Sequence, residues 1–310
     1  MKKFFALMLA TLMLVAAFTG CSSADTKDTT DDSKDVVSEN GNTESDTKDD
    51  APETSGVVAV VDVNLTDEEY AFGVDKEKPE LLAKVNEIIA KIMADGTFDE
   101  ICNHYFGDGT PVPVVSAELD SSKEQLVVAT NAAFEPFEYM VGDSYYGIDM
   151  EIADLIAKEL DLELVISNMD FDAVCLSVGQ HKCDIAMSGL TVKEDRKEYV
   201  DFTDSYYSAS QKLIIKSDDT TFADCTDAAS VEEILKSFDS SKKIGCQAGT
   251  TAQFYIEGDQ DWGFDGLPVE CVPYKNGSLA VQDLINGNID YVIIDSAPAD
   301  AITAAINEMN

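Results

Sequence analysis

Residues 183–196 read CDIAMSGLTVKEDR, a short apolar run followed by small residues and then by charged ones. The first six residues predict a strand. Thr191 and Glu194 have the spacing of a capping box, which predicts a helix over residues 192–199 with free backbone N–H groups at its start. Arg196 lies just inside that helix. A helix start beside a guanidinium is suited to bind a carboxylate.

The same alternation of apolar strands and amphipathic helices continues on both sides of this stretch. We predict further strands over residues 126–130, 162–166, 211–216, 243–246, 269–274 and 291–295. We predict further helices over residues 148–160, 171–178, 231–238, 252–257 and 279–285, and from 297 onward. This density of alternation is typical of an α/β fold with mostly parallel sheets. Ligands in such folds bind at the carboxyl ends of the strands.

Polar and aromatic residues follow several of the predicted strands. The segment NAAFEPFEY (131–139) brings an aromatic residue to one strand end, and Gln247 to Thr251 form a second turn that opens a helix. Asp295 ends the strand YVIID and is suited to an ammonium group. One arginine, one aspartate and two helix starts would neutralise a zwitterion that leaves water, as the burial of charge requires.

The chain begins with the features of an export signal. Lys2 and Lys3 precede an apolar run from Phe4 to Phe18, and Cys21 follows small residues. This pattern predicts a signal peptide over residues 1–21, and the run is short for a transmembrane helix. Cys21 after the cleavage site resembles a bacterial lipobox, which predicts lipidation at that cysteine. An ordinary signal peptide that ends near a cysteine is the alternative.

The next segment, residues 22–56, is predicted to be a disordered acidic linker. Residues 22–55 hold 11 acidic side chains against 3 lysines and almost no apolar residues, a composition that cannot form a core. The whole chain carries a formal net charge of −39, which argues against nucleic acid as a partner. The spacing of the six cysteines after Cys21 fits no zinc motif, and it does not determine any disulfide pairing.

Several longer stretches, taken in order, resemble one protein family. They are TNAAFEPFEY, YYGIDMEIADLIAKEL, MDFDAVCLSVGQHKCDIAMSGLTVKEDR and VDFTDSYYSASQKLIIK, then IGCQAGTTAQFY and LINGNIDYVIIDSAPA. Together they look like the extracytoplasmic amino-acid-binding proteins of ABC transporters, bacterial solute-binding family 3. The resemblance covers most of residues 125–310 and implies a two-lobed α/β fold of the periplasmic-binding-protein type II.

The resemblance also implies roles for particular residues. Arg196 resembles the arginine that binds the ligand carboxylate, and Asp295 resembles the acid that binds the ammonium. Phe134 and Phe171 are similar to aromatic residues that sandwich the ligand side chain, and Asp149 is expected to hold a turn. The remaining ligand-binding candidates are Asn131, Ser188, Gly189, Thr191, Gln247, Thr250 and Thr251. Because Asn131 and Gln247 are neutral, they favour a polar, uncharged ligand side chain.

Residues 57–107 resemble the end of this fold, although they come first. Leu82, Val85, Ile89 and Ile92 mark one buried helix face that begins at Pro79 and stops at Gly96. Thr97 and Glu100 have capping-box spacing and predict a second helix that ends at Phe106. This segment resembles the last strand and helix pair of the family, so the domain is predicted to be circularly permuted. A relic of an upstream second copy is the alternative.

These observations together predict a solute-binding domain over residues 57–310. Lobe one is expected near residues 65–208, lobe two near 217–310, and hinge strands near 57–64 and 209–216. The resemblance implies an extracytoplasmic, lipid-anchored protein that captures an amino acid and delivers it to a permease and its ATPase. It implies no catalytic residue, cofactor or metal. An enzyme of the same fold, such as a cyclohexadienyl dehydratase, and a ligand-sensing module are the alternatives.

Overall fold

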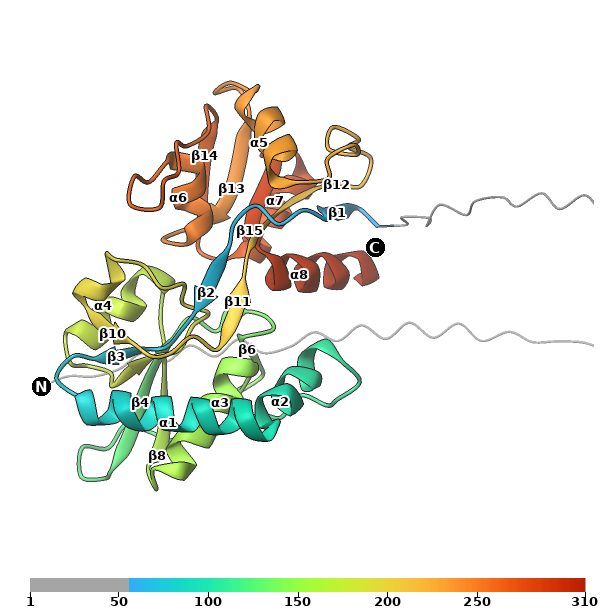
Figure 1. Cartoon of the computed structure of the whole chain (residues 1–310). Coiled ribbons are helices and arrows are strands. Elements are labelled where there is room, and N and C mark those ends of the chain that lie inside the picture. Colours follow the sequence, from blue (N-terminus) through green and yellow to red (C-terminus); the bar gives the residue numbers. More distant parts are fainter. Residues whose placement is uncertain (1–55, 310) are drawn as a thin grey trace, which may run out of the picture. The chain divides into compact units, whose positions relative to one another are not determined.

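A computed structural model describes residues 56–309, and these residues build two five-stranded sheets (Figure 1). The predicted signal peptide, Cys21 and all of the predicted linker except Gly56 lie outside the described residues. The described residues cluster as one unit by their contacts, so the two sheets belong to one domain with two lobes. Within residues 56–309, no helix has the length and apolar character that a membrane crossing needs.

Lobe one is built on the sheet with strand order β10-β3-β9-β4-β8. Its strands are β3 (Gly73–Asp75), β4 (Gln125–Thr130), β8 (Glu163–Asn168), β9 (Ile185–Ala186) and β10 (Val200–Phe202). Its helices are α1 (Pro79–Asp95), α2 (Thr97–Phe106), α3 (Ile148–Glu159) and α4 (Val174–Gly179), with short 3-10 turns η1 (Phe171–Ala173) and η2 (Arg196–Glu198). A small sheet of β5 (Ala133–Phe134), β6 (Glu138–Val141) and β7 (Ser144–Tyr146) completes the lobe.

Lobe two is built on the sheet with strand order β1-β12-β15-β13-β14. Its strands are β1 (Val58–Val61), β12 (Gln211–Lys216), β13 (Lys243–Gln247), β14 (Glu270–Tyr274) and β15 (Tyr291–Asp295). Its helices are α5 (Ala228–Lys236), α6 (Thr251–Glu257), α7 (Gly277–Asn286) and α8 (Ser296–Met309). Between the two sheets, β2 (Glu68–Tyr70) pairs antiparallel with β11 (Tyr207–Ala209), and Figure 1 shows this ribbon crossing from one lobe to the other.

The early segment packs where the sequence predicts. Strand β1 pairs along β12, with Val58 opposite Lys216 and Val61 opposite Leu213. Helix α1 begins at Pro79, and Gly96 ends it in the left-handed conformation at φ 87°. Its apolar face joins the core of lobe one with residues of α3 and β9. The prediction that residues 81–107 pack against lobe one is therefore confirmed.

Two local expectations about this fold are wrong. The sheets are mixed rather than mostly parallel: each has two parallel and two antiparallel pairings, because β1 and β12 in one sheet and β3 and β10 in the other run against their neighbours. The Thr97–Glu100 capping box does not form either. Gly96 is the cap residue of α2, and the backbone N–H of Thr97 donates to Asp95 Oδ1 at 3.0 Å. The left-handed turn at Gly96 leaves Thr97 inside the helix.

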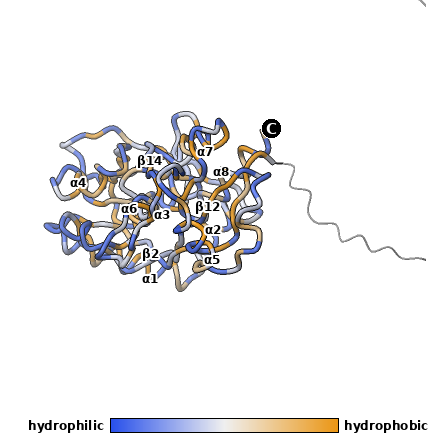
Figure 2. Tube along the Cα trace, turned by 90° about the horizontal axis from the view of Figure 1, so that it is seen from above, coloured by the Kyte–Doolittle hydropathy of each residue, from blue (hydrophilic) through white to orange (hydrophobic). Residues whose placement is uncertain are grey.

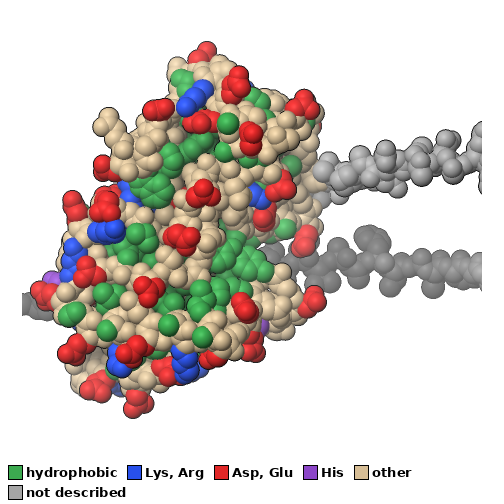
Figure 3. Space-filling model, in the orientation of Figure 1, with side chains coloured by type: hydrophobic (Ala, Val, Ile, Leu, Met, Phe, Trp, Pro, Cys, Tyr) green, Lys and Arg blue, Asp and Glu red, His purple; other side chains and the backbone are tan. Residues whose placement is uncertain are grey.

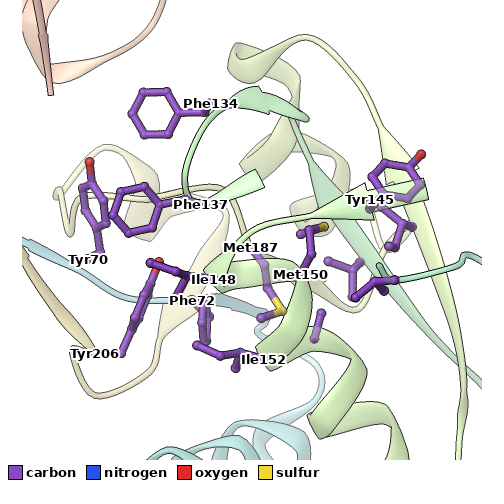
Figure 4. Close-up of a cluster of buried hydrophobic side chains, with 14 of the residues drawn as sticks. Tyr70, Phe72, Phe134, Phe137, Tyr145, Ile148, Met150, Ile152, Met187 and Tyr206 are labelled. Carbon is purple, nitrogen blue, oxygen red and sulfur yellow. The ribbon is translucent and has the colours of Figure 1, made fainter. Parts of the chain in front are cut away.

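The core of lobe one is aromatic near the crossing strands. Figure 4 shows Tyr70 and Phe137 side by side, and their ring centroids lie 5.1 Å apart in an edge-to-face arrangement. Phe72 stacks on Tyr206 at 4.3 Å.

Along the trace in Figure 2, apolar and polar segments alternate, as expected for elements that each bury one face. Acidic side chains are spread over the face shown in Figure 3 rather than gathered in one patch.

Candidate ligand-binding site

One small cavity lies between the lobes and holds most of the predicted binding residues. Its free volume is about 10 Å³, far below the roughly 300–1,000 Å³ of typical small-molecule sites. Its lining residues are Phe134, Phe171, Gly189, Thr191, Arg196, Gln247, Thr250, Thr251 and Asp295. The other two candidates lie outside this lining: Asn131 Oδ1 accepts from the lining residue Gln247 at 3.0 Å, and the Ser188 hydroxyl accepts from the backbone N–H of Asn131 at 3.1 Å. A space of this size is about what one water molecule needs, so a solute can enter only if the lobes part.

Arg196 supplies the positive charge of the cavity. Its side chain is buried, its Nη1 donates to the Thr191 carbonyl at 2.7 Å, and its Nη2 donates to the Gly249 carbonyl of lobe two at 3.2 Å. These bonds fix the plane of the guanidinium while leaving other N–H donors unassigned. A guanidinium held in this way can bind a carboxylate through two parallel hydrogen bonds.

The predicted helix at this loop is wrong. Only the short turn η2, Arg196–Glu198, is present, and Thr191 caps no helix. The Thr191 hydroxyl instead donates to Glu68 Oε2 of β2 at 2.7 Å. Because the crossing strand takes up this hydroxyl, the loop is held by tertiary contacts and not by a capping box.

Asp295 supplies the negative charge, from the end of β15. It is buried, and its Oδ1 accepts a 2.5 Å hydrogen bond from the hydroxyl of Tyr70. Burial, with the nearby charge of Glu68, raises the pKa of Asp295 to about 7, while the hydrogen bonds from Tyr70 and Gln211 oppose the shift. An ammonium group beside Asp295 would favour the ionised carboxylate.

Lobe two also presents polar groups from the start of α6. The Thr250 hydroxyl donates to the Gln247 carbonyl at 2.8 Å, and the Thr251 hydroxyl lies 3.4 Å from that of Thr191. Gln247 Nε2 donates to Asn131 Oδ1 at 3.0 Å, which joins the lobes behind the cavity. The buried Oε1 of Gln247 has no hydrogen-bond partner among the described residues, so it is an acceptor available to a ligand.

Aromatic residues and one glycine shape the rest of the wall. The Arg196 guanidinium carbon lies 5.2 Å from the ring centroid of Phe171, so Phe171 supports the arginine as well as lining the cavity. Phe134 is buried beside Gly189. Gly189 has φ +50°, and a Cβ there would lie 2.9 Å from the Phe134 ring. The turn therefore needs glycine for its backbone and for its close approach to Phe134.

A set of buried acids surrounds the cavity, and sequence reasoning missed most of it. Asp149 accepts bonds from the Gly189 N–H at 2.9 Å and from Tyr206 at 2.6 Å, which confirms that it holds a turn. Burial raises the pKa of Asp149 to about 7 and also raises the pKa of Glu138. Glu138 accepts a bond from Ser188 at 2.9 Å. The sequence holds a signal for this set. Glu138 lies in the segment NAAFEPFEY that follows the predicted strand 126–130, and Asp149 lies at the start of the next predicted helix, 148–160.

The histidines and cysteines lie elsewhere. His104 contacts Glu151 at 2.9 Å, and His181 contacts Asp75 at 2.9 Å, so neither histidine faces the cavity. Cys246 and Cys271 have their sulfur atoms 3.6 Å apart, and all six cysteines of the described region are free thiols. Among residues 56–309, no group of His, Cys, Asp and Glu is arranged to hold a metal ion.

Two α/β lobes, a crossing ribbon and one cavity lined by a cation, a carboxylate and aromatic rings define a two-lobed solute-binding protein. Residues 22–108 and 126–307 match the family model of the bacterial extracellular solute-binding proteins, family 3, and the chain belongs to that family.

Individual relatives agree with this assignment. The chain is 33% identical over 180 residues to the ABC transporter arginine-binding protein 1 of Escherichia coli (strain K12), a match that covers 57% of this chain and 65% of that protein. It is 36% identical over 99 residues to the arginine-binding extracellular protein ArtP of Bacillus subtilis (strain 168), covering 32% of this chain and 39% of the relative. These matches thus span about two fifths to just under two thirds of the relatives' lengths.

Solved structures give the same result for the fold. The structure of holo ArgBP from T. maritima aligns with a TM-score of 0.50 and 32% identity, covering 59% of this chain and 74% of that one. The two-lobed periplasmic-binding fold predicted from the sequence is therefore confirmed.

Proposed function

We propose that this protein captures an amino acid between its lobes and presents it for transport. The observation that carries the proposal is the placement of Arg196 and Asp295 in one cavity, contributed by opposite lobes. A zwitterion needs both charges compensated when it leaves water. Closure brings the Asp295 side of lobe two onto a solute held by Arg196 of lobe one, so the solute stabilises the closed form by contacting both.

Transport requires partners, which the family membership supports. We propose that the closed protein delivers its amino acid to an ABC transporter permease and its ATPase outside the cytoplasm. Two relatives are named as arginine-binding, one of them as an extracellular protein and the other as part of an ABC transporter. Lipid attachment at Cys21, with residues 22–56 as spacer, would hold the domain at the membrane surface.

The domain is proposed to be a circular permutant of the family fold. The end of α8 lies beside the start of β1: the N–H of Val57 donates to Asn307 Oδ1 at 2.9 Å, and Asn307 Nδ2 donates to the Val58 carbonyl at 2.9 Å. A chain could therefore pass from α8 directly into β1 with little rearrangement. Residues 108–124 supply the other connection, from α2 to β4. We propose lobes over residues 65–208 and 217–310, with hinge strands near 57–64 and 209–216.

Calorimetry of the purified chain against the twenty amino acids tests the proposed function. We expect at least one to bind with a dissociation constant below about 1 mM, corresponding to roughly −4 kcal/mol. Arginine and histidine are informative members of the panel because relatives are named for them. If no amino acid binds in this range, the proposal is wrong.

Derivatives of the amino acid that binds most tightly test the two charged contacts one at a time. Its carboxamide lacks the carboxylate expected at Arg196, and its N-acetyl form lacks the ammonium expected at Asp295. Both should bind at least about tenfold more weakly, since each loses a charged hydrogen bond in a buried site. Equal binding of either derivative would contradict the assigned orientation.

A further inference from the structure

Lys193 is a buried lysine that lies outside the ligand cavity. It belongs to the loop between β9 and η2, and only 6% of its surface is exposed. Its Nζ lies 2.7 Å from Asp259 Oδ2, 3.0 Å from Asp195 Oδ2 and 3.5 Å from the centroid of the Phe254 ring. Asp195 is on the same loop, whereas Phe254 and Asp259 belong to lobe two. The lysine therefore bridges the lobes.

The bridge acts on one helix of lobe two. Phe254 lies within α6, and Asp259 follows its end. On the other side, Arg196 Nη2 donates to the Gly249 carbonyl, just before α6 begins. The loop of residues 191–196 thus holds α6 at both ends, and α6 begins with Thr251 of the ligand cavity. Any motion that parts the lobes must break both connections.

The chemistry of Lys193 suits a contact that forms on closure. An ammonium group is buried favourably only where charges and aromatic rings replace its water. Lys193 has two carboxylates and the face of a ring, and most of these partners come from lobe two. The hydrogen bond from Lys193 lowers the pKa of Asp259, so the acid stays ionised. All these contacts join protein atoms to protein atoms, so they are available whether or not the cavity is filled.

We propose that Lys193 is a latch that holds the lobes closed through Asp259 and Phe254, independently of the solute. The latch sets the fraction of protein in the closed form before the solute contributes. Since the apparent dissociation constant equals the intrinsic one divided by that fraction, the latch also sets the affinity. Its effect on affinity rests on the proposed binding function, but its effect on closure does not.

The substitution Lys193→Met tests the latch, because it keeps an apolar side chain over Phe254 and removes the charge. Lys197→Met is the matched control: Lys197 is on the same loop, but it pairs at 2.6 Å with Glu194 of its own lobe. We expect solute-free Lys193→Met to show a larger radius of gyration by small-angle X-ray scattering. We expect its dissociation constant for the best amino acid to rise about tenfold, while Lys197→Met changes neither.

A solute-free scattering curve of Lys193→Met identical to that of Lys197→Met would overturn the latch. If the affinity of Lys193→Met falls while that curve stays identical, Lys193 acts only by ordering the Arg196 loop. If no amino acid binds the unsubstituted protein, the proposed function fails, yet the solute-free scattering still decides the latch.

A second variant tests the latch in case Lys193→Met does not fold. Asp259→Asn keeps Oδ1, which accepts the N–H groups of Asp261 at 2.9 Å and Trp262 at 3.3 Å, and it replaces the Oδ2 that faces Lys193. We expect this variant, like Lys193→Met, to increase the radius of gyration of the solute-free protein. An unchanged radius of gyration in a folded Asp259→Asn protein would contradict the proposal.

Discussion

The hydroxyl of Tyr70 donates a 2.5 Å hydrogen bond to Oδ1 of Asp295, joining two residues 225 positions apart in the sequence. Tyr70 comes from β2, one of the two strands that cross between the lobes, and Asp295 ends the central strand of lobe two. Both side chains are buried. The charge state of the cavity carboxylate therefore depends on a segment that lies near the other end of the chain.

Replacing Tyr70 with phenylalanine should weaken solute binding, and more so at low pH. The Tyr70 hydrogen bond lowers the pKa of Asp295, so its removal leaves Asp295 protonated up to a higher pH. A protonated acid cannot pair with an ammonium group. We expect a loss of about 1.5–3 kcal/mol in binding free energy, larger at pH 6 than at pH 8, by calorimetry.

Tyr105→Phe is the control for that prediction. Tyr105 also donates to a carboxylate, Glu151, at 2.6 Å, but within lobe one and away from the cavity. Its affinity for the solute should match that of the unsubstituted protein at both pH values. A Tyr70→Phe protein with the same pH profile as Tyr105→Phe would contradict the role of Tyr70.

The buried acids predict that the solute-free protein loses stability as the pH rises. Burial raises the pKa of Asp295 from its ordinary 3.8 to about 7 in the folded state, so the folded form binds more protons than the unfolded form between these values. The free energy of unfolding therefore falls with rising pH across this window, by up to about 4 kcal/mol for this group. Asp295→Asn should flatten that decline, measured as melting temperature from pH 5 to 8.

Asp300→Asn provides the comparison, since it removes the same charge from an exposed position on α8. Its melting temperature should follow the pH dependence of the unsubstituted protein. If Asp295→Asn and Asp300→Asn showed the same pH dependence, burial of Asp295 would not explain the decline.

Arg196→Lys should bind the solute about 10–100-fold more weakly although it keeps the charge. Lysine cannot hold the carbonyls of Thr191 and Gly249 while it also presents two parallel donors to a carboxylate. Calorimetry measures the dissociation constant of the Arg196→Lys protein, with Lys197→Met as the control. Retained affinity in the Arg196→Lys protein would show that a point charge is enough.

Gly189→Ala should cost more stability than Gly142→Ala, and it should also weaken solute binding. Both Gly189 (φ +50°) and Gly142 (φ +63°) have left-handed backbones, but only at Gly189 would a new Cβ meet a ring, 2.9 Å from Phe134. Gly142→Ala should cost about 1–2 kcal/mol of stability from backbone strain. Gly189→Ala should cost about 1–3 kcal/mol more and should weaken binding, measured by denaturant unfolding and calorimetry.

The permutation predicts that a rearranged chain will fold. Residues 125–310, joined by a short linker to residues 57–107, should bind the solute as the natural order does, because Asn307 already contacts Val57 and Val58. Residues 125–310 alone should not fold stably, since they lack β3, which joins β9 to β10 in the lobe-one sheet. Full binding by residues 125–310 alone would instead favour the relic of an upstream copy.

Much of the fold could be predicted because it rests on local patterns. Helix α3 covers residues 148–159 where 148–160 is predicted, and β15 covers the predicted residues 291–295. Two of the predictions that failed, the capping boxes at Thr97 and at Thr191, concern hydrogen bonds with competing partners. The Thr191 hydroxyl fits a capping box by spacing, yet it donates to Glu68, which no local pattern connects to it.

The sequence by itself indicated the α/β class, because the alternation of strands and helices is a local feature. Its resemblance to one family implied the two lobes and most of the residues that line the cavity. Only the tertiary structure decided which neighbours surround those residues. Tyr70 and Glu68 reach the site through strand pairing between distant segments, and burial there raises the pKa of Asp295. Lys193 likewise gains its partners only when α6 of the other lobe packs against it. Burial and cross-lobe contact depend on the packing of the whole chain, which no local spacing encodes.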